Sequence, residues 1–354
     1  MKLRAVCLAL TILIAAPAGA AAAAVKPCAI AGPVDEAGYV KIGGIEQWVT
    51  IRGDSCANPV VLFLHGGPGN PLSPYGGGIY QAWEKDFTLV QWDQRGAGRT
   101  FARNPPPAAL TVERMARDGI AVAEHLRTRI GQDRVILVGG SWGSVLAVHM
   151  ALARPDLFHA YVGAGQLVRY PENLAQSYAH LLARARAAGD GETIARIGAL
   201  GPPPWTDPRN AGILRRATRA YERRSTTPPP AGWWTPAPAY ADAASQQALE
   251  GGDDYSYLQF VGADGRGMAS TIDLPALGLE FRIPVFLVQG AEDLVTVPSV
   301  ARAYFDSLSA PSKEFRLLAA TGHDPNAAMV EAQYEILKAR VLPRIRKAQR
   351  RRRG

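Results

Sequence analysis

The chain has 354 residues, of which 47% are hydrophobic and 20% charged, and its formal net charge is +8 at pH 7. This composition excludes a disordered chain, and the length allows a large buried core that needs no metal or disulfide framework. Eight of the positive charges lie between Arg340 and Gly354, and Lys2 and Arg4 lie at the other end of the chain. The rest of the chain is therefore close to neutral, which predicts no nucleic-acid-binding surface. We interpret residues 347–354 as a solvated basic tail.

The N-terminus has the three parts of an export signal. Lys2 and Arg4 give it a positive start, residues 5–16 form an apolar stretch, and Ala18-Gly19-Ala20 fits a cleavage site of small residues. We therefore predict a signal peptide over residues 1–24 and a periplasmic or secreted mature protein. The apolar stretch is shorter than a bilayer span, so no stable membrane insertion is expected after cleavage; a retained anchor is the alternative.

Two cysteines, Cys28 and Cys56, remain after removal of the signal. In an oxidising compartment a pair with no third partner is expected to form a disulfide, which would stabilise the fold by roughly 3–4 kcal/mol. Two buried free thiols are the alternative. Neither cysteine has another cysteine or a histidine at ligand spacing, so no metal site is predicted.

Alternating polar and apolar residues predict two antiparallel strands at 38–42 and 45–51, joined by Gly43-Gly44. From residue 60 onward the chain has short, nearly continuous apolar runs separated by helical patterns, which is typical of a parallel sheet covered on both faces. The apolar runs lie at 60–65, 87–93, 134–140, 159–165, 284–290 and 314–320. The helical patterns lie chiefly at 111–130, at 143–154, near 298–308 and from about residue 325 onward.

Residues 168–280 interrupt this alternation. The segment is rich in proline and has helical stretches at 171–188 and 208–223, but no run typical of a buried strand. We predict that it forms a mostly helical insertion, the cap, over one end of the sheet after the sixth strand. The predicted fold class is therefore α/β, with a mostly parallel sheet flanked by helices and formed by residues 25–167 and 281–346.

Residues 135–147 read VILVGGSWGSVLA, a G-x-S-x-G motif between an apolar strand and a helix. In this context the serine lies in a sharp, strained turn, and the flanking glycines let backbone segments pass closely. The turn would expose the Ser141 hydroxyl at the end of the strand and place the amide N–H of Trp142 at a helix N-terminus, where it can stabilise an oxyanion. The alternative is a structural serine.

A serine nucleophile needs a base, which in this architecture follows in the order serine, acid, histidine. Of the six histidines only His323 follows a late strand and precedes the last helix, so we predict it as the base; a surface-loop histidine is the alternative. The loop after the preceding strand contains Glu292 and Asp293. We favour Asp293 as the orienting acid because a shorter side chain in a turn is held more firmly. Asp324, next to the histidine, is badly placed to reach its ring.

The loop after the first core strand reads HGGPG (65–69). Its adjacent glycines would let a backbone N–H approach a substrate closely, so we expect this loop to supply the second oxyanion donor. A tight turn that binds no ligand is the alternative.

HGGPG, QWDQRGAGRT (91–100), GGSWGS (139–144), the GAED turn and the TGH loop together resemble the proline iminopeptidase family of α/β-hydrolases. The resemblance covers about residues 38–165 and 280–346. It implies the α/β-hydrolase fold with a helical cap, and hydrolysis through an acyl-serine by a triad of Ser141, Asp293 and His323. It implies no metal or organic cofactor.

The same resemblance implies that Gly67 and Trp142 are the oxyanion donors, with Gly66 adjacent. It also implies that Asp93 and Arg95 in the DQRG motif brace the HGGPG loop. The cap departs from the family pattern, because members that bind a free amino group do so with cap glutamates in a W-x-x-W-E-like stretch, whereas residues 233–238 here read WWTPAP.

The cap nevertheless offers candidate substrate-binding residues. Glu222, Glu250, Asp253 and Asp254 are possible replacements for the missing acid, or solvated charges. Trp205, Trp233, Trp234 and Tyr240 would line an apolar acyl pocket or pack the cap core.

The sequence therefore predicts an exported serine hydrolase whose substrate is a small molecule or a short peptide with an N-terminal proline or small apolar residue. An esterase or amidase for small apolar acyl groups is the alternative. A non-catalytic binding protein on the same fold is the alternative from another class.

Overall fold

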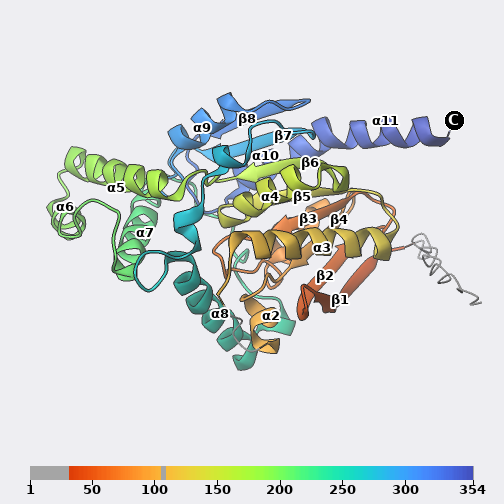
Figure 1. Cartoon of the computed structure of the whole chain (residues 1–354), viewed down its shortest axis with the longest axis horizontal. Helices are drawn as coiled ribbons and strands as arrows, with labels where there is room; N and C mark the ends of the chain where they lie inside the picture. The colour runs from red at the N-terminus through yellow and green to blue at the C-terminus, as the bar shows by residue number, and fades with distance from the viewer. Residues whose placement is uncertain (1–31, 105–108, 354) are drawn as a thin grey trace, which may run out of the picture.

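The structure is a computed structural model that describes residues 32–104 and 109–353. The predicted signal peptide and Cys28 lie outside the described residues. Eight strands form one sheet in the order β1-β2-β4-β3-β5-β6-β7-β8, and helices cover both of its faces (Figure 1). The strands are β1 (Val34–Ile42), β2 (Ile45–Gly53), β3 (Val60–Leu64), β4 (Thr88–Trp92), β5 (Val135–Gly140), β6 (Phe158–Ala164), β7 (Val285–Gly290) and β8 (Lys313–Leu318).

The helices alternate with the strands from β3 onward. They are α1 (Gly76–Tyr80), α2 (Gly98–Arg103), α3 (Val112–Ile130), α4 (Trp142–Ala153), α5 (Tyr170–Ala187), α6 (Gly191–Gly198), α7 (Pro208–Glu222), α8 (Ala243–Val261), α9 (Pro298–Ser307), α10 (Ala327–Ile336) and α11 (Leu342–Arg353). Short 3-10 turns and a π-helical turn at Leu337–Val341 complete the described elements.

The sheet is antiparallel only at its N-terminal edge. β1 pairs with β2, and β2 pairs with β4, in antiparallel register, whereas every pairing from β4 to β8 is parallel. This arrangement confirms the predicted mostly parallel sheet flanked by helices. Because parallel strands end at the same edge, the loops after β3, β5, β7 and β8 meet at one edge of the sheet.

Alternate residues of β3 belong to the two faces of the core. Val60, Leu62 and Leu64 pack in one buried cluster with α3, α4 and α9. Val61 and Phe63 pack in a second cluster with α1, α10 and the start of α11. All five side chains are buried, which explains why this strand is continuously apolar in the sequence.

The ends of α3 agree with local sequence signals. The Thr111 side chain accepts a hydrogen bond from the backbone N–H of Arg114 at 3.2 Å, and Gly131 ends the helix with a φ of 78°. Between them, Met115, Val122 and Leu126 face the core at helical spacing.

Helices α5 to α8 of the cap follow β6 and precede β7 (Figure 1). Helices α5, α6 and α7 enclose a small apolar core of their own, which includes Leu181, Ile197 and Leu214. Two of these helices match the predicted stretches at 171–188 and 208–223. At the other end of the molecule, α11 extends away from the body and carries the basic tail. Within the described part of the chain, no helix has the length and apolarity needed to cross a membrane.

Candidate active site

Ser141 lies in the sharp turn between β5 and α4. Its backbone has φ 52° and ψ −120°, a strained conformation for a residue with a side chain. Its own amide donates to the carbonyl oxygen of Ala164 on the neighbouring strand at 2.9 Å, which helps to hold the turn in place. The geometry is that of a strand–turn–helix nucleophile elbow.

The two flanking glycines are required by close backbone contacts. A Cβ added at Gly143 would lie 1.9 Å from the carbonyl oxygen of Leu64 on β3, and one added at Gly139 would lie 2.6 Å from the carbonyl oxygen of Gly143. Any side chain at these positions would therefore displace the elbow.

The structure brings the three predicted catalytic residues together. Ser141 Oγ lies 3.0 Å from His323 Nε2, and His323 Nδ1 lies 3.0 Å from Asp293 Oδ2. Because an ionised carboxylate can only accept, Nδ1 carries the proton in this arrangement, and Nε2 is left to accept the proton of Ser141. Asp293 and His323 come from the loops after β7 and β8, as the order of the motifs predicts.

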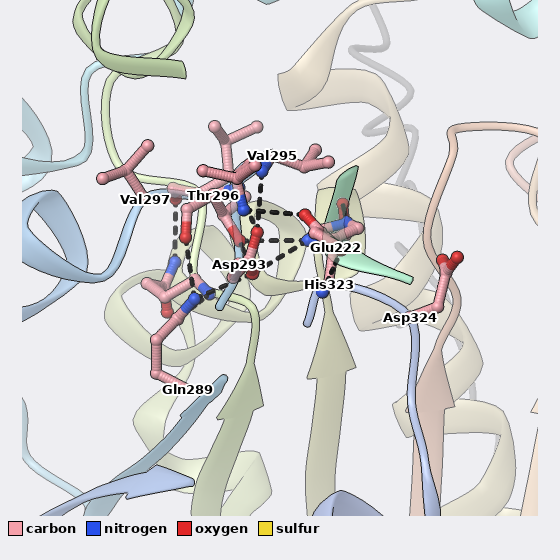
Figure 2. A network of polar contacts seen from close by, with 12 residues as sticks. Glu222, Gln289, Asp293, Val295, Thr296, Val297, His323 and Asp324 are labelled. Atoms are coloured by element: carbon pink, nitrogen blue, oxygen red, sulfur yellow. Dashed lines mark hydrogen bonds and ion pairs between the residues drawn. The ribbon is translucent and has the colours of Figure 1, made fainter. Parts of the chain in front are cut away.

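Several hydrogen bonds fix the position of the Asp293 carboxylate (Figure 2). It accepts hydrogen bonds from the backbone amides of Val295 and Thr296, from the Thr296 hydroxyl and from the Gln289 side chain, at 2.6–2.8 Å. These contacts fix the acid before any substrate binds. Glu292 instead forms an ion pair with Arg184 of α5 at 2.7 Å.

The environment of His323 favours its protonated form. Burial alone would lower the pKa of the imidazole, but the charge and the hydrogen bond of Asp293 raise it above its ordinary value of 6.5. Asp293 therefore stabilises the imidazolium that forms when the histidine takes the proton from Ser141.

A cap residue holds the backbone of both catalytic loops. Glu222, at the end of α7, accepts the amide of Leu294 at 2.7 Å and the amide of His323 at 2.8 Å (Figure 2). Burial and the nearby charge of Asp293 raise the pKa of Glu222 to about 7. The sequence predicts Glu222 as a substrate-binding acid or a solvated charge, whereas in the structure each of its carboxylate oxygens accepts a backbone amide.

Further cap contacts reach the same loops. Asp324 points away from the triad in Figure 2 and forms an ion pair with Arg219 of α7 at 2.7 Å. The Ser177 hydroxyl of α5 donates to the carbonyl oxygen of Leu294, and the amide of Val297 donates to the side chain of Asn173. The cap is therefore joined to the loops that carry the acid and the base.

The predicted oxyanion residues lie next to the nucleophile. Trp142 is the first residue of α4, where the first-turn amides have no helical acceptor. A Cβ added at Gly66 would lie 3.4 Å from Cβ of Ser141, and Gly67 lines the cavity above the serine. The positions suit backbone N–H groups directed at a developing negative charge.

The bracing of the HGGPG loop differs from our expectation. Gln94, within the DQRG motif, makes the hydrogen bonds to this loop. Its backbone amide donates to Nε2 of His65, and its side chain donates to the carbonyl oxygen of His65. Its Oε1 accepts a hydrogen bond from the indole of Trp142. Arg95 instead pairs with Asp118 and donates to the carbonyl oxygen of Gly43. The motif therefore identified the right segment, but Gln94 rather than Arg95 contacts the HGGPG loop.

The other part of the motif also has a different role. Asp93 accepts from the Ser73 hydroxyl at 2.6 Å and from the amide of Arg99 at 3.0 Å, so it links the segment before α1 to α2. Burial of Asp93 raises its pKa to about 7. His65 has a pKa lowered to about 4 by burial, so it is a neutral structural residue at physiological pH.

A cavity that is partly open to solvent lies between the triad and the cap. Ser141 and His323 form part of its lining, and α5, α7 and α8 supply most of the rest. Several lining residues are apolar, and among the described residues that line the cavity none is acidic and one, Arg215, is a cation. Sequence reasoning missed Arg215. The available signal was its place on the face of α7 that also carries Ala211, Leu214 and Thr218.

The structure places the cap residues predicted to bind substrate outside this lining. Trp205 packs in the cap core and donates to the carbonyl oxygens of Leu200 and Gly201. Trp234 is 42% exposed and contacts the ring of Tyr75, while Trp233 is partly buried against the core cluster that includes Ile79 and Tyr80 of α1.

Tyr240 is also buried. Its hydroxyl accepts from the indole of Trp48 at 2.9 Å, and the Arg99 guanidinium lies over its ring. None of the four aromatic residues lines the cavity, so of the two expectations the acyl pocket is wrong for this cavity, and only Trp205 packs in the cap core.

The chain is similar to known proteins in sequence and in fold. The family model described as alpha/beta hydrolase fold matches residues 59–327. The probable aminopeptidase YbaC of Bacillus subtilis (strain 168) is 27% identical over 301 residues, which cover 81% of this chain and 90% of that protein. The proline iminopeptidase of Neisseria gonorrhoeae is 33% identical over 141 residues, so this match spans only 42% of that protein.

A solved structure gives the same result. The proline iminopeptidase-related protein of Thermus thermophilus has a TM-score of 0.59 and 26% identity, over 87% of this chain and 99% of that one. The family match covers most of the chain, including the nucleophile elbow and both catalytic loops. The chain therefore belongs to the alpha/beta hydrolase fold family and is related to the proline iminopeptidases.

Proposed function

We propose that this protein is a serine aminopeptidase of the proline iminopeptidase type, which releases an N-terminal proline or small apolar residue from short peptides. The observation that carries the hydrolase part is the hydrogen-bonded chain from Ser141 through His323 to Asp293 at the floor of a cavity. The relatives support the aminopeptidase part, because their printed names describe a probable aminopeptidase and proline iminopeptidases.

The geometry of the triad supports the following reaction. Ser141 Oγ attacks the carbonyl carbon while His323 Nε2 takes its proton, and backbone N–H groups of Trp142 and the HGGPG loop stabilise the oxyanion. The C–N bond then breaks, and His323 returns the proton to the leaving amine. A water molecule attacks the acyl-serine with His323 again as the base, which releases the acid and restores the Ser141 hydroxyl.

An esterase or amidase for small apolar acyl groups is the second candidate, and one observation favours it. A free amino group needs a carboxylate partner if it is to be desolvated in a cavity. None of the described lining residues is acidic, and both oxygens of Glu222 already accept backbone amides.

The test is hydrolysis of prolyl- and alanyl-arylamides and of acetyl and butyryl aryl esters, with Ser141→Ala as the control. Cleavage of the free-amine arylamides, lost when the amine is acylated, would support the aminopeptidase. Cleavage of the esters alone would support the second candidate. Ser141→Ala is expected to reduce turnover by at least about a thousandfold and to abolish labelling by a fluorophosphonate. A wild-type protein that neither turns over these substrates nor labels would be a binding protein on this fold.

We also propose that the protein is exported, on the basis of the charged start, apolar stretch and small-residue site in residues 1–24. Expression of the full chain in a Gram-negative host, followed by fractionation and N-terminal sequencing, tests this. A periplasmic product that begins between about residues 18 and 25 is expected, and a cytoplasmic product that retains Met1 would contradict it.

A further inference from the structure

The catalytic cavity contains a cation that has no carboxylate partner among the described residues. Arg215 lies on α7 and lines the cavity together with Ser141 and His323. Its guanidinium makes one long hydrogen bond, from Nη2 to Oδ1 of Asn70 at 3.4 Å. Within the described part of the chain, no carboxylate oxygen lies within ion-pair distance of it.

The nearest acids are engaged elsewhere. Asp253 of α8 accepts the side-chain amide of Asn70 at 2.6 Å, and Asp324 forms its ion pair with Arg219 at 2.7 Å. Both acids act on Arg215 only through space. Burial, together with the like charge of Arg219, lowers the pKa of Arg215, in agreement with the lack of an ion pair to the described residues.

Most other polar side chains of the lining already have partners inside the protein. Asn173, Ser177 and Thr218 donate to backbone carbonyl oxygens, and Tyr257 donates to the carbonyl oxygen of Pro208. Tyr170 differs, because its hydroxyl makes no hydrogen bond to the described residues although its ring lies against Phe260. Arg215 acts electrostatically on Tyr170 and Tyr257, and all three residues line the same cavity.

An arginine in this position is suited to one kind of ligand. A guanidinium offers several N–H donors in a planar fork, which matches the two oxygens of a carboxylate. A partly desolvated cation without a partner is unfavourable, and a substrate carboxylate would relieve that cost where water is excluded. The hydroxyl of Tyr170 can supply one more donor.

We propose that Arg215 binds a carboxylate carried by the substrate, so that this hydrolase selects anionic acyl compounds or short peptides with a free C-terminus. This inference rests on the proposed hydrolase function and adds to it the charge of the substrate. The carboxylate has two possible positions, on the leaving group, as in a dipeptide, or on the acyl group, as in a dicarboxylic acid monoester.

Two matched pairs of substrates separate these positions. Prolyl-alanine is compared with prolyl-alaninamide for the leaving side, and the 4-nitrophenyl monoester of succinic acid with its methyl-capped form for the acyl side. The measured quantity is the ratio of kcat/KM between the charged and the uncharged member. Wild-type protein, Arg215→Met and Arg215→Lys are assayed at the same pH, with Arg216→Met as the control because Arg216 is exposed on the same helix.

In the wild type a ratio of roughly tenfold to a hundredfold is expected in at least one pair, the range that a hydrogen bond to a charged group gives. Arg215→Met should reduce that ratio to about one, Arg215→Lys should retain part of it, and Arg216→Met should leave it unchanged. Retained fluorophosphonate labelling shows that a variant is folded.

A wild-type ratio near one in both pairs, or a ratio that persists in Arg215→Met, would overturn the carboxylate site. In either case, Ser141-dependent cleavage of the uncharged substrates would still support the hydrolase function. If neither pair is cleaved and Ser141 does not label, the function and the carboxylate site fail together.

Discussion

The backbone amide of His323, in a core loop, donates a hydrogen bond of 2.8 Å to the carboxylate of Glu222, in the cap. The same carboxylate accepts the amide of Leu294, next to Asp293. One side chain of the cap therefore sets the spacing between the loop of the acid and the loop of the base, which gives Glu222 a positioning role.

Replacement of Glu222 by glutamine tests that role. Glutamine keeps one acceptor but turns an NH₂ group toward the other backbone amide, and it removes a negative charge that favours the imidazolium of His323. We expect kcat/KM to fall by about tenfold and the acidic limb of its pH profile to move to lower pH. Glu250→Gln, at an exposed position of α8, should change neither quantity.

The substrate dependence of Glu222→Gln separates two roles. A positioning residue acts on every substrate, so arylamide and ester hydrolysis should fall together. If only free-amine substrates were affected, through KM, Glu222 would be an amine-binding residue instead.

The pH dependence of activity follows from the raised pKa of His323. The neutral imidazole is the base, so activity is lost as the pH falls through that pKa, and the midpoint of the acidic limb of kcat/KM should lie above 6.5. Asp293→Asn removes the charge that raises the pKa, so the midpoint should move down while kcat falls by roughly 10⁴-fold. A wild-type midpoint below 6.5 would contradict this account.

The raised pKa of His323 affects the stability of the fold in the opposite direction to activity as the pH changes. A histidine whose folded pKa is raised stabilises the fold below its unfolded pKa, and this contribution is lost as the pH rises through the folded value. The fold should therefore gain stability from His323 under mildly acidic conditions in which the enzyme is inactive.

The buried ion pair between Arg95 and Asp118 is expected to be important for stability. Their side chains are only 5% and 4% exposed, and Asp118 also accepts from Gln47. Asp118→Ala would leave a buried guanidinium unpaired and should cost about 3–5 kcal/mol in denaturant unfolding.

A matched exposed pair provides the control. Arg302 and Asp306 lie one turn apart on α9 and are 57% and 55% exposed. Asp306→Ala should cost at most about 0.5 kcal/mol. Equal losses in the two variants would show that burial does not determine the strength of these pairs.

The elbow glycine Gly143 should tolerate no side chain. Because the Cβ of alanine would lie 1.9 Å from the carbonyl oxygen of Leu64, Gly143→Ala should abolish fluorophosphonate labelling and lower Tm, or prevent folding altogether. Gly198→Ala, at an open position of α6, is the matched control and should be neutral or stabilising by up to about 1 kcal/mol. Normal labelling of Gly143→Ala would contradict the elbow geometry.

The disulfide between Cys28 and Cys56 stays a prediction, since Cys28 lies outside the described residues. The intact mass of the exported protein should rise by two hydrogens on reduction, and the oxidised protein should resist thiol alkylation under denaturing conditions. Alkylation of both cysteines without a reductant would refute the bridge.

The catalytic residues could be predicted because each belongs to a local pattern. Ser141 follows a buried strand within a glycine motif, and Asp293 and His323 follow the last two strands, so their chain order alone places them at one edge of the sheet. The contacts of Glu222, Arg215 and Gln94 depend on the packing of segments far apart in sequence. No local pattern gives such packing.

The secondary structure of helix α8 also depends on a contact that no local pattern predicts. Gly251-Gly252 lies inside it and weakens the helical pattern in this part of the insertion, which the sequence predicts to be mostly helical. In the fold, a Cβ on Gly252 would lie 3.0 Å from the amide of Gly98, so the glycine allows α8 to approach α2 closely. A tertiary contact therefore overrides a weak local preference.

The hydrogen bonds of Glu222 restrict how the protein can be re-engineered. The cap is an attractive part to exchange with that of a relative, because it supplies most of the lining of the catalytic cavity. Here an exchanged cap would also remove the group that spaces the acid loop from the base loop. A chimera therefore needs an acceptor at position 222, or loops taken from the same donor as the cap, if the host core is to keep a working triad.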